Sequence, residues 1–234
     1  QTHAGTYYFV DGEGWINASD LSTTDNRIEA VQKVLNEKYN NQERISVYVK
    51  QLDTDRVAAI NDEKSMYAAS VAKLGVLYYA QERLSQKKLS LSDEYQYTSA
   101  VNGFPGAYDP DGSGKISKMP DDKNYSLENL LKAVAQNSDN VATNILGYYV
   151  TNQYDKAFQK SVDKAAATSW NMDKKELTAR AAGTLMEAVY RQNGDIINYL
   201  SSTDYDGERI SKNIDVPVAH KIGDAYDFKH DVAI

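Results

Sequence analysis

The chain has 234 residues, of which 41% are hydrophobic and 25% are charged, so it is long enough for one large domain with a substantial core. Its formal net charge of −7 argues against nucleic acid as a general partner. The sequence has no cysteine, which excludes disulfides and thiolate metal sites. No apolar run has membrane-spanning length and no signal peptide opens the chain, so any secretion signal is expected to have been removed or to lie upstream.

Residues 1–22 alternate aromatic and polar side chains around Gly12 and Gly14, which predicts two short strands joined by a turn. The segment GWINASDL resembles the closing strand of the Gly-Trp type wall-binding modules of Gram-positive surface proteins. The resemblance implies the tail of an upstream module and a location outside the cell, at the surface of a Gram-positive bacterium. The alternative is an N-terminal arm that packs on the main domain.

The main domain is expected to span residues 24–234, and it opens with a helix that Asp25 can cap. The apolar face of this helix consists of Ile28, Val31 and Leu35. Residues 44–53 then alternate as a strand, and residues 57–62 return as its hairpin partner.

The segment YAASVAKLGVLYYA, residues 67–80, predicts a helix whose first turn carries Ser70 and Lys73 on one face. A serine hydroxyl becomes nucleophilic when a nearby base takes its proton, and a lysine can do so where apolar surroundings lower its pKa. The same Ser-x-x-Lys spacing occurs at Ser85 and Ser161, but in polar, lysine-rich surroundings that indicate solvated surface. Ser70 is therefore the candidate nucleophile, against the alternative that it merely begins a helix.

Residues 99–124 are rich in Gly, Asp and Pro, which predicts a long loop. Within it Asp109, Asp111 and Ser113 stand at alternate positions, as in an EF-hand calcium loop. Pro120 occupies the place where such a loop supplies a bidentate glutamate. We expect either a weak structural calcium site or a plain acidic turn.

The next helix, which Ser126 can cap, breaks at residues 137–140, NSDN, before another apolar helix. Polar residues between two buried helices are costly unless hydrogen-bonded, so they form either a polar junction or part of a site. Further along, a helix is expected from Thr178 to Gly194, followed by a strand at about 216–222. A last strand beginning at Asp231 stops with the sequence, which we interpret as truncation.

Three segments in this order carry a family resemblance: SVAK at 70–73, SDN at 138–140 and HKIG at 220–223. Together they resemble the Ser-x-x-Lys, Ser-Asp-Asn and Lys-Thr-Gly signatures of the class A β-lactamase and penicillin-binding D,D-peptidase superfamily. We call them the first, second and third signatures. The resemblance implies an α/β (α+β) fold in which helices flank an antiparallel sheet and a subdomain is all helical. It also implies one further strand and a C-terminal helix, which these residues lack.

By this resemblance Ser70 would form an acyl-enzyme, with Lys73 accepting its proton. Ser138 would relay a proton to the leaving nitrogen, and Lys221 would stabilise the substrate carboxylate. Asn140, Gly223 and Asp224 would bind substrate. The backbone N–H groups of Ser70 and Asp224 would form the oxyanion hole.

Two departures from the family pattern bear on activity. Ile222 stands where the third signature has threonine or serine, so a hydroxyl that helps to bind the substrate carboxylate is missing. The glutamate that activates the deacylating water has no match, since residues 168–177 offer only Asp173 and Glu176 as carboxylates. Asn144, which matches the residue that holds that glutamate, is retained. Without a positioned base, deacylation should be slower by about 10²–10⁴-fold.

The leading hypothesis is a secreted serine hydrolase or acyl-transferase that acts on β-lactams or peptidoglycan D-Ala-type peptides and deacylates poorly. It needs no cofactor, and we expect a monomer with no membrane span. Two alternatives are a wall-associated binding protein whose catalytic fold has decayed and a calcium-regulated surface protein.

Overall fold

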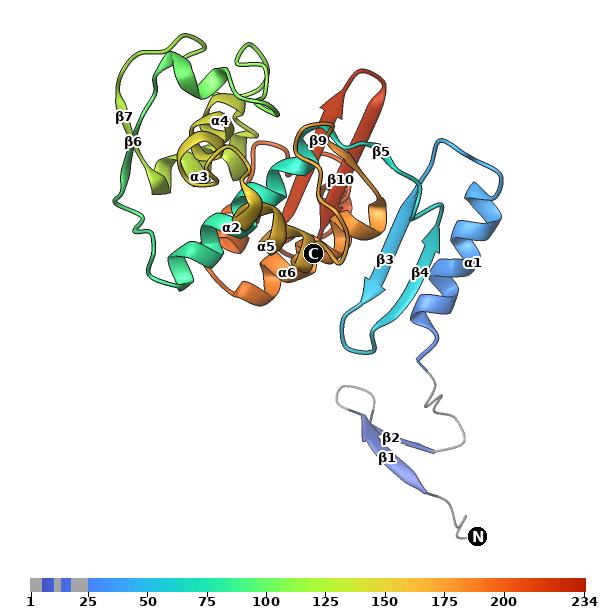
Figure 1. Cartoon of the computed structure of the whole chain (residues 1–234). Helices are drawn as coiled ribbons and strands as arrows, with labels where there is room; N and C mark the ends of the chain where they lie inside the picture. Colours follow the sequence, from blue (N-terminus) through green and yellow to red (C-terminus); the bar gives the residue numbers. More distant parts are fainter. Residues whose placement is uncertain (1–5, 11–13, 18–24) are drawn as a thin grey trace, which may run out of the picture. The chain divides into compact units, whose positions relative to one another are not determined.

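The computed structural model describes residues 6–10, 14–17 and 25–234 of the chain (Figure 1). Gly12 and residues 18–22 of the predicted wall-binding fragment lie outside the described residues. The elements up to and including the one that carries Ser70 are β1 (Tyr7–Val10), β2 (Gly14–Asn17), α1 (Arg27–Tyr39), β3 (Val47–Gln51), β4 (Arg56–Ile60), β5 (Met66–Tyr67) and the 3-10 helix η2 (Ala69–Lys73).

The elements after η2 supply most of the helical part of the chain. In order they are α2 (Leu74–Ser85), β6 (Glu94–Gln96), η3 (Ser99–Asn102), β7 (Asn124–Ser126), α3 (Leu127–Asn137), α4 (Asn140–Tyr149), α5 (Lys156–Ala166), β8 (Glu176–Leu177), α6 (Ala179–Gln192), α7 (Asp195–Leu200), η4 (Ser211–Asn213), β9 (His220–Ala225) and β10 (Phe228–Ala233).

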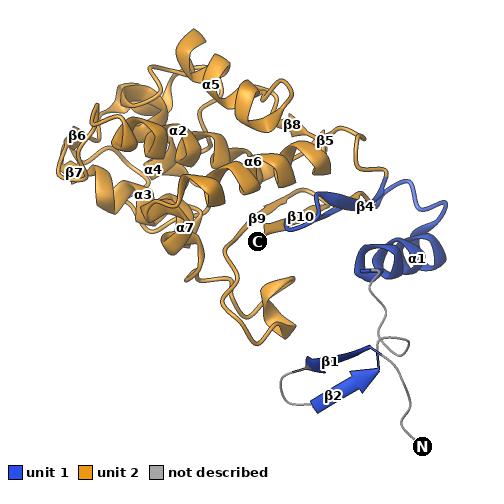
Figure 2. Cartoon of the chain, turned by 90° about the horizontal axis from the view of Figure 1, so that it is seen from below, with its two compact units in different colours: residues 1–45, 49–60 blue, residues 46–48, 61–234 orange. Residues whose placement is uncertain are grey.

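The chain divides into two compact units, shown in different colours in Figure 2. The first unit comprises residues 1–45 and 49–60, and the second comprises residues 46–48 and 61–234. All three signatures lie in the second unit, so the candidate site belongs to it alone.

The first unit contains two of the predicted features. Strands β1 and β2 pair antiparallel, as the alternating pattern predicts, and α1 buries Ile28 and Leu35 on its predicted face. The Asp25 carboxylate accepts a hydrogen bond from the Arg27 N–H at 3.0 Å. The Gln32 side chain on α1 exchanges hydrogen bonds of 3.0 and 2.8 Å with the backbone of Ala59 on β4, which satisfies polar groups of that strand.

Helix α2 forms the centre of the second unit and packs against α3, α4, α5, α6 and α7 (Figure 1). It is apolar on most of its surface, and a helix that is apolar all round must be covered on all sides. Gly75 allows Trp170 to lie against it, because a Cβ there would come within 2.7 Å of the indole nitrogen. That nitrogen donates to the Ala72 carbonyl at 3.1 Å.

Helix ends in the second unit follow from local residue chemistry. The Ser126 and Thr178 hydroxyls accept backbone N–H bonds at the starts of α3 and α6, as predicted. Helix α6 ends at Gln192, two residues before the predicted stop at Gly194, because Asn193 takes the left-handed conformation and Gly194 already precedes α7. The helix expected to begin at Ser70 is a 3-10 turn up to Lys73, and the α-helix begins at Leu74.

The final hairpin corrects two predicted boundaries. Strand β9 begins at His220 rather than near 216, because His220 pairs with Ala233 and Ala219 with Ile234, so that no residue of β10 lies opposite residues 216–218. Strand β10 begins at Phe228 rather than Asp231, after a turn in which Tyr226 is left-handed. The pair is antiparallel, with Lys221 opposite Val232 and Ile222 opposite Asp231.

The predicted α+β class is confirmed: within the described residues, seven α-helices accompany strands that pair in two-stranded sheets. Of the described helices, none has the length and apolar character that crossing a membrane requires.

Candidate active site

Ser70 follows a strained turn that several hydrogen bonds hold in place. Ala69 has a φ of 49°, a left-handed conformation that costs a non-glycine residue about 1–2 kcal/mol. Tyr108 donates its hydroxyl to the Ala69 carbonyl at 3.2 Å, and the Ala68 N–H donates to the Lys175 carbonyl at 2.7 Å. The turn presents Ser70, half-buried, to a small pocket at the start of the helix.

Lys73 lies one turn beyond Ser70 and is wholly buried. Its amine donates hydrogen bonds of 2.6 Å to both the Ser138 carbonyl and the Asn140 side-chain oxygen, and it lies 3.4 Å from the Ser138 hydroxyl. Burial lowers the pKa of Lys73 well below its usual value, and the charge of Lys221 lowers it further. A buried amine that tends to be neutral can act as a base toward a neighbouring hydroxyl.

The second signature joins α3 to α4 and supplies both a cap and site residues. Ser138 is left-handed at the end of α3, and Asp139 caps α4 through the Ala142 N–H at 2.8 Å. The other Asp139 oxygen accepts the N–H groups of Lys115 and Ile116. The segment is therefore a polar junction between the two helices, and Ser138 also lines the pocket. A role in a reaction stays a prediction.

The third signature lies on β9, and its lysine reaches the second signature. Lys221 is buried, and its amine donates to the Ser138 hydroxyl at 2.8 Å and to the Ile222 carbonyl at 3.0 Å. Burial lowers the pKa of Lys221 to about 7, against the opposing effect of Asp231 and Asp224. Gly223 brings the strand against the turn that holds Ser70, because a Cβ there would lie 2.6 Å from the Ala68 carbonyl oxygen.

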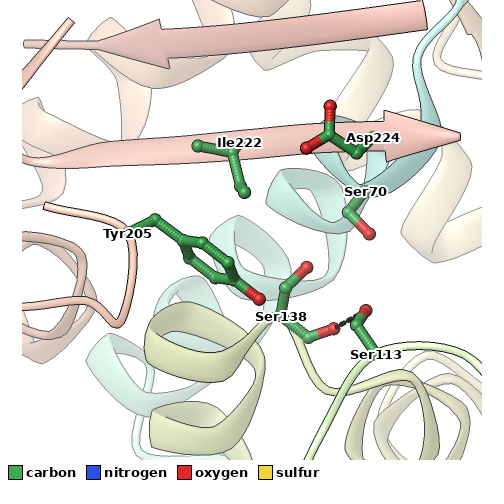
Figure 3. A pocket seen from close by; sticks show the side chains of 6 residues that line it. All are labelled: Ser70, Ser113, Ser138, Tyr205, Ile222 and Asp224. Atoms are coloured by element: carbon green, nitrogen blue, oxygen red, sulfur yellow. Dashed lines mark hydrogen bonds between the residues drawn. The ribbon is translucent and has the colours of Figure 1, made fainter. Parts of the chain in front are cut away.

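The pocket beside Ser70 has a volume of about 100 Å³. Six side chains line it, and Figure 3 shows them: Ser70, Ser113, Ser138, Tyr205, Ile222 and Asp224. Segments distant in sequence thus bring together Ser70, Ser138 and two side chains of β9, Ile222 and Asp224. Lys73 and Asn140 are not among the lining side chains. They are hydrogen-bonded to each other, and the Lys73 amine contacts the lining residue Ser138.

The loop predicted to bind calcium packs against the second signature. The Ser113 hydroxyl donates to the Ser138 carbonyl at 2.8 Å, and Asn140 donates its side-chain N–H to the Asp109 carbonyl at 2.7 Å. The Asp109 carboxylate accepts the Asp111 N–H at 2.9 Å. No group of three or more His, Asp or Glu side chains suited to a metal occurs in the part of the chain that the structure describes. Calcium binding stays a prediction, while Ser113 belongs to the pocket.

Residues 168–177, where the family resemblance would place a deacylating glutamate, turn a lysine inward. Asp173 and Glu176 are exposed, whereas Lys175 between them is buried and donates to the Gly106 carbonyl at 3.0 Å. The amines of Lys175 and Lys73 lie 4.5 and 4.6 Å from the centre of the Tyr108 ring. Burial lowers the pKa of Lys175.

Asn144 does not hold a carboxylate of that loop in this structure. Its side-chain oxygen accepts the Tyr108 N–H at 2.7 Å, and its N–H group donates to the Tyr108 carbonyl at 2.8 Å and to Asn102 at 2.9 Å. Asn144 therefore fixes the loop that carries Tyr108.

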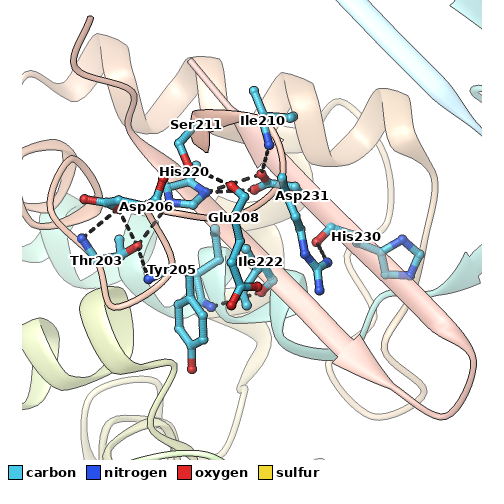
Figure 4. A network of polar contacts seen from close by, with 12 residues as sticks. Thr203, Tyr205, Asp206, Glu208, Ile210, Ser211, His220, Ile222, His230 and Asp231 are labelled. Carbon is cyan, nitrogen blue, oxygen red and sulfur yellow. Dashed lines mark hydrogen bonds and ion pairs between the residues drawn. The ribbon is translucent and has the colours of Figure 1, made fainter. Parts of the chain in front are cut away.

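A second polar cluster anchors the loop before β9 (Figure 4). The His220 ring lies 3.1 Å from both the Asp231 and Asp206 carboxylates, through different nitrogens, and 3.0 Å from the Thr203 hydroxyl. The hydrogen bond to Asp231 raises the pKa of His220, against the effect of burial. This cluster ties the segment that carries Tyr205 to the strand that carries Lys221.

Sequence reasoning missed Tyr108, Tyr205, Lys175 and Arg209 as members of the site or its support. Arg209 lies in the GERI segment before β9 and forms an ion pair with Asp224. The sequence feature that pointed to Arg209 was its place in GERI, shortly before the third signature. The other three come from loops whose path the sequence does not reveal.

A buried lysine beside a pocket serine, with a second serine and a second lysine in contact, on an α+β fold, characterises serine hydrolases and acyl-transferases. The sequence model of the β-lactamase enzyme family matches residues 26–234, and the chain belongs to that family. No curated protein matches the chain in sequence.

Solved structures of similar fold include β-lactamases and penicillin-binding proteins. The structure of PBP-A has a TM-score of 0.67 and 14% identity, over 87% of this chain and 85% of that one. A β-lactamase from Sphaerobacter thermophilus DSM 20745 has a TM-score of 0.68 and 15% identity, over 90% and 83%. Penicillin binding protein 5 from Haemophilus influenzae has a TM-score of 0.53 and 18% identity, over 63% and 45%. At these identities the likeness is one of fold.

Proposed function

We propose that the protein forms an acyl-enzyme on Ser70 with β-lactams or peptidoglycan D-Ala-type peptides and deacylates it slowly. The observation that carries this proposal is the buried chain of contacts Lys73–Ser138–Lys221 next to the Ser70 pocket. A solved structure of a PBP-A mutant as an acyl-enzyme complex with penicillin G, at a TM-score of 0.66, supports the choice of reaction.

In the proposed reaction Lys73 takes the proton of the Ser70 hydroxyl as the oxygen attacks the acyl carbonyl. The backbone N–H groups of Ser70 and Asp224 stabilise the negative charge on the carbonyl oxygen. The Ser138 hydroxyl, which accepts from Lys221, passes its proton to the leaving nitrogen as the carbon–nitrogen bond breaks, and takes from Lys73 the proton that came from Ser70. The product is a serine ester and a free amine. Asn140 and Gly223 position the substrate and the β9 strand.

Slow deacylation follows from the side chains of residues 168–177. A water molecule needs a base to attack the serine ester, and the carboxylates of this loop are exposed while Lys175 faces inward. General-base catalysis contributes about 10²–10⁴-fold, so its absence gives a long-lived adduct.

The test is intact-mass analysis after long incubation with excess fluorescent penicillin. The expected result is one added ligand on the wild-type protein and on Ser85→Ala, and none on Ser70→Ala. Ser85 is a matched control, because it starts another Ser-x-x-Lys pattern outside the pocket. Labelling that persists in Ser70→Ala would contradict the proposal.

A wall-associated binding protein with a decayed site is the second candidate, favoured by Ile222 and by the exposed loop carboxylates. It would bind purified cell walls without acylation by any lactam, ester or peptide. A monomeric state and a location at the Gram-positive cell surface are further proposals. Size-exclusion chromatography with light scattering and cell fractionation test them.

A further inference from the structure

One end of the Ser70 pocket has an unusual lining. Ile222 and Tyr205 flank it, and the Asp224 carboxylate lies in the wall near Ser70 (Figure 3). An apolar side chain offers no hydrogen bond to an anion, and a carboxylate in the wall repels one.

The cations near this end already donate to the protein's own groups. Arg209 forms an ion pair with Asp224 and donates to the His230 carbonyl at 2.6 Å. Lys221 donates to the Ser138 hydroxyl and the Ile222 carbonyl. Its pKa of about 7 leaves the amine only partly charged near neutral pH. An incoming anion would have to compete with these partners for both cations.

The hydroxyl donors of the pocket are engaged as well. The Tyr205 hydroxyl donates to the Asn137 carbonyl at 3.3 Å, and the Ser113 hydroxyl donates to the Ser138 carbonyl at 2.8 Å. In the proposed reaction the Ser70 hydroxyl attacks the acyl carbonyl and the Ser138 hydroxyl transfers a proton, so neither serves to bind a substrate carboxylate. A carboxylate placed against Ile222 would therefore lose its water without gaining equivalent donors.

We propose that the substrate group lying against Ile222, Tyr205 and Asp224 is uncharged, so the protein prefers acyl donors whose leaving group carries an amide, ester or alcohol rather than a free carboxylate. This inference rests on the proposed function and narrows its substrate class. Donors with a carboxylate at this point, including penicillins, react more slowly than neutral analogues of equal intrinsic reactivity.

A pair of thioesters tests the inference: an N-acyl-D-alanyl thioester of thioglycolate and the same thioester with the thioglycolate carboxylate as its methyl amide. Ser70 forms a carbon–oxygen bond to the acyl carbon, the carbon–sulfur bond breaks, and the proton of the hydroxyl passes through Lys73 to the leaving thiol. Water then hydrolyses the ester. Thiol release can be followed with a disulfide reagent, because the chain has no cysteine of its own.

The wild-type protein is expected to show a kcat/KM about 10- to 100-fold higher for the amide than for the carboxylate, which corresponds to the loss of a charged hydrogen bond. Ile222→Thr adds a hydroxyl and Asp224→Asn removes the repelling charge, and each should lower this ratio. Ile222→Val matches threonine in shape without the hydroxyl, and its ratio should follow the wild type. Using ratios within one variant cancels differences in folding.

A wild-type ratio of one or less would overturn the inference while leaving Ser70 acylation intact. A ratio that Ile222→Thr and Ile222→Val change equally would overturn the role assigned to the missing hydroxyl. Thiol release no greater than in Ser70→Ala for both donors would overturn the proposed function itself, and the inference with it.

Discussion

Replacing Gly223 with alanine tests the packing that positions Ser70, the proposed nucleophile. The added Cβ would lie 2.6 Å from the Ala68 carbonyl oxygen and 3.0 Å from the Val71 nitrogen. Both atoms belong to the backbone on either side of Ser70, so neither can rotate away as a flexible side chain would. The strand or the turn must shift instead.

The expected cost follows from overpacking, about 1–3 kcal/mol. For a chain of this length each kcal/mol lowers Tm by about 2–4 °C, so Gly223→Ala should melt about 2–12 °C lower. Acylation should slow further than this loss of stability explains, because a shift of about 1 Å at a reacting group can cost about 100-fold. Calorimetry gives Tm, and the time course of the penicillin adduct gives the rate.

Gly207→Ala is the matched control, since a Cβ at that position meets nothing within 4 Å. It should change the free energy of unfolding by less than about 0.5 kcal/mol and leave acylation unaffected. If Gly223→Ala gave the same Tm and rate as Gly207→Ala, the close contact between β9 and the Ser70 turn would be refuted.

Three further predictions concern titration and deacylation. The pKa of His220 is raised in the folded protein, so the protonated ring stabilises the fold fully below about pH 6.5, and this stabilisation is lost as pH rises through the folded-state pKa. Urea unfolding should show the free energy of unfolding fall over that range, and His220→Gln should remove this pH dependence. The charge of Lys175 lowers the pKa of Lys73, so Lys175→Met should move the pH profile of acylation to higher pH. Because Asp173 and Glu176 are exposed, Asp173→Asn and Glu176→Gln should change the adduct lifetime by less than about twofold.

Each of these has a contrasting outcome. Lys174 is exposed next to Lys175, so Lys174→Met should leave the pH profile in place, and an equal shift in both variants would contradict a specific effect of the buried amine. A stability difference between wild type and His220→Gln that is constant with pH would contradict the role of imidazole protonation. A much longer adduct lifetime in either carboxylate variant would identify a base that the structure does not place near Ser70.

The central residues of the site could be predicted because their signals are local. A serine and a lysine one helical turn apart, and polar residues at the break between two apolar helices, are visible in the sequence. In the structure Ser70 and Ser138 line one pocket together with side chains of β9, and Lys73 and Lys221 contact Ser138. The α+β class was implied by the family resemblance that the three ordered signatures carry.

The rest of the site depends on how loops and strands distant in sequence come together, which local sequence patterns do not encode. Residues 109–113 read as a calcium loop because carboxylates alternate there, yet the chain folds back so that Ser113 reaches Ser138. Lys175 faces inward because its backbone pairs with Ala68, a contact across more than 100 positions that only the folded chain provides. Strand β9 begins later than predicted because its start is set by its register with β10, which the pattern of residues 216–222 does not contain.

The most direct test of the central claim is peptide mapping of the acyl adduct by mass spectrometry, on wild type and on Lys73→Met. The account predicts a single modified peptide with the acyl group on Ser70, and at least a 100-fold slower appearance of that peptide in Lys73→Met, because the base is lost. An adduct on any other residue, or one that forms at the wild-type rate without the Lys73 amine, would contradict it.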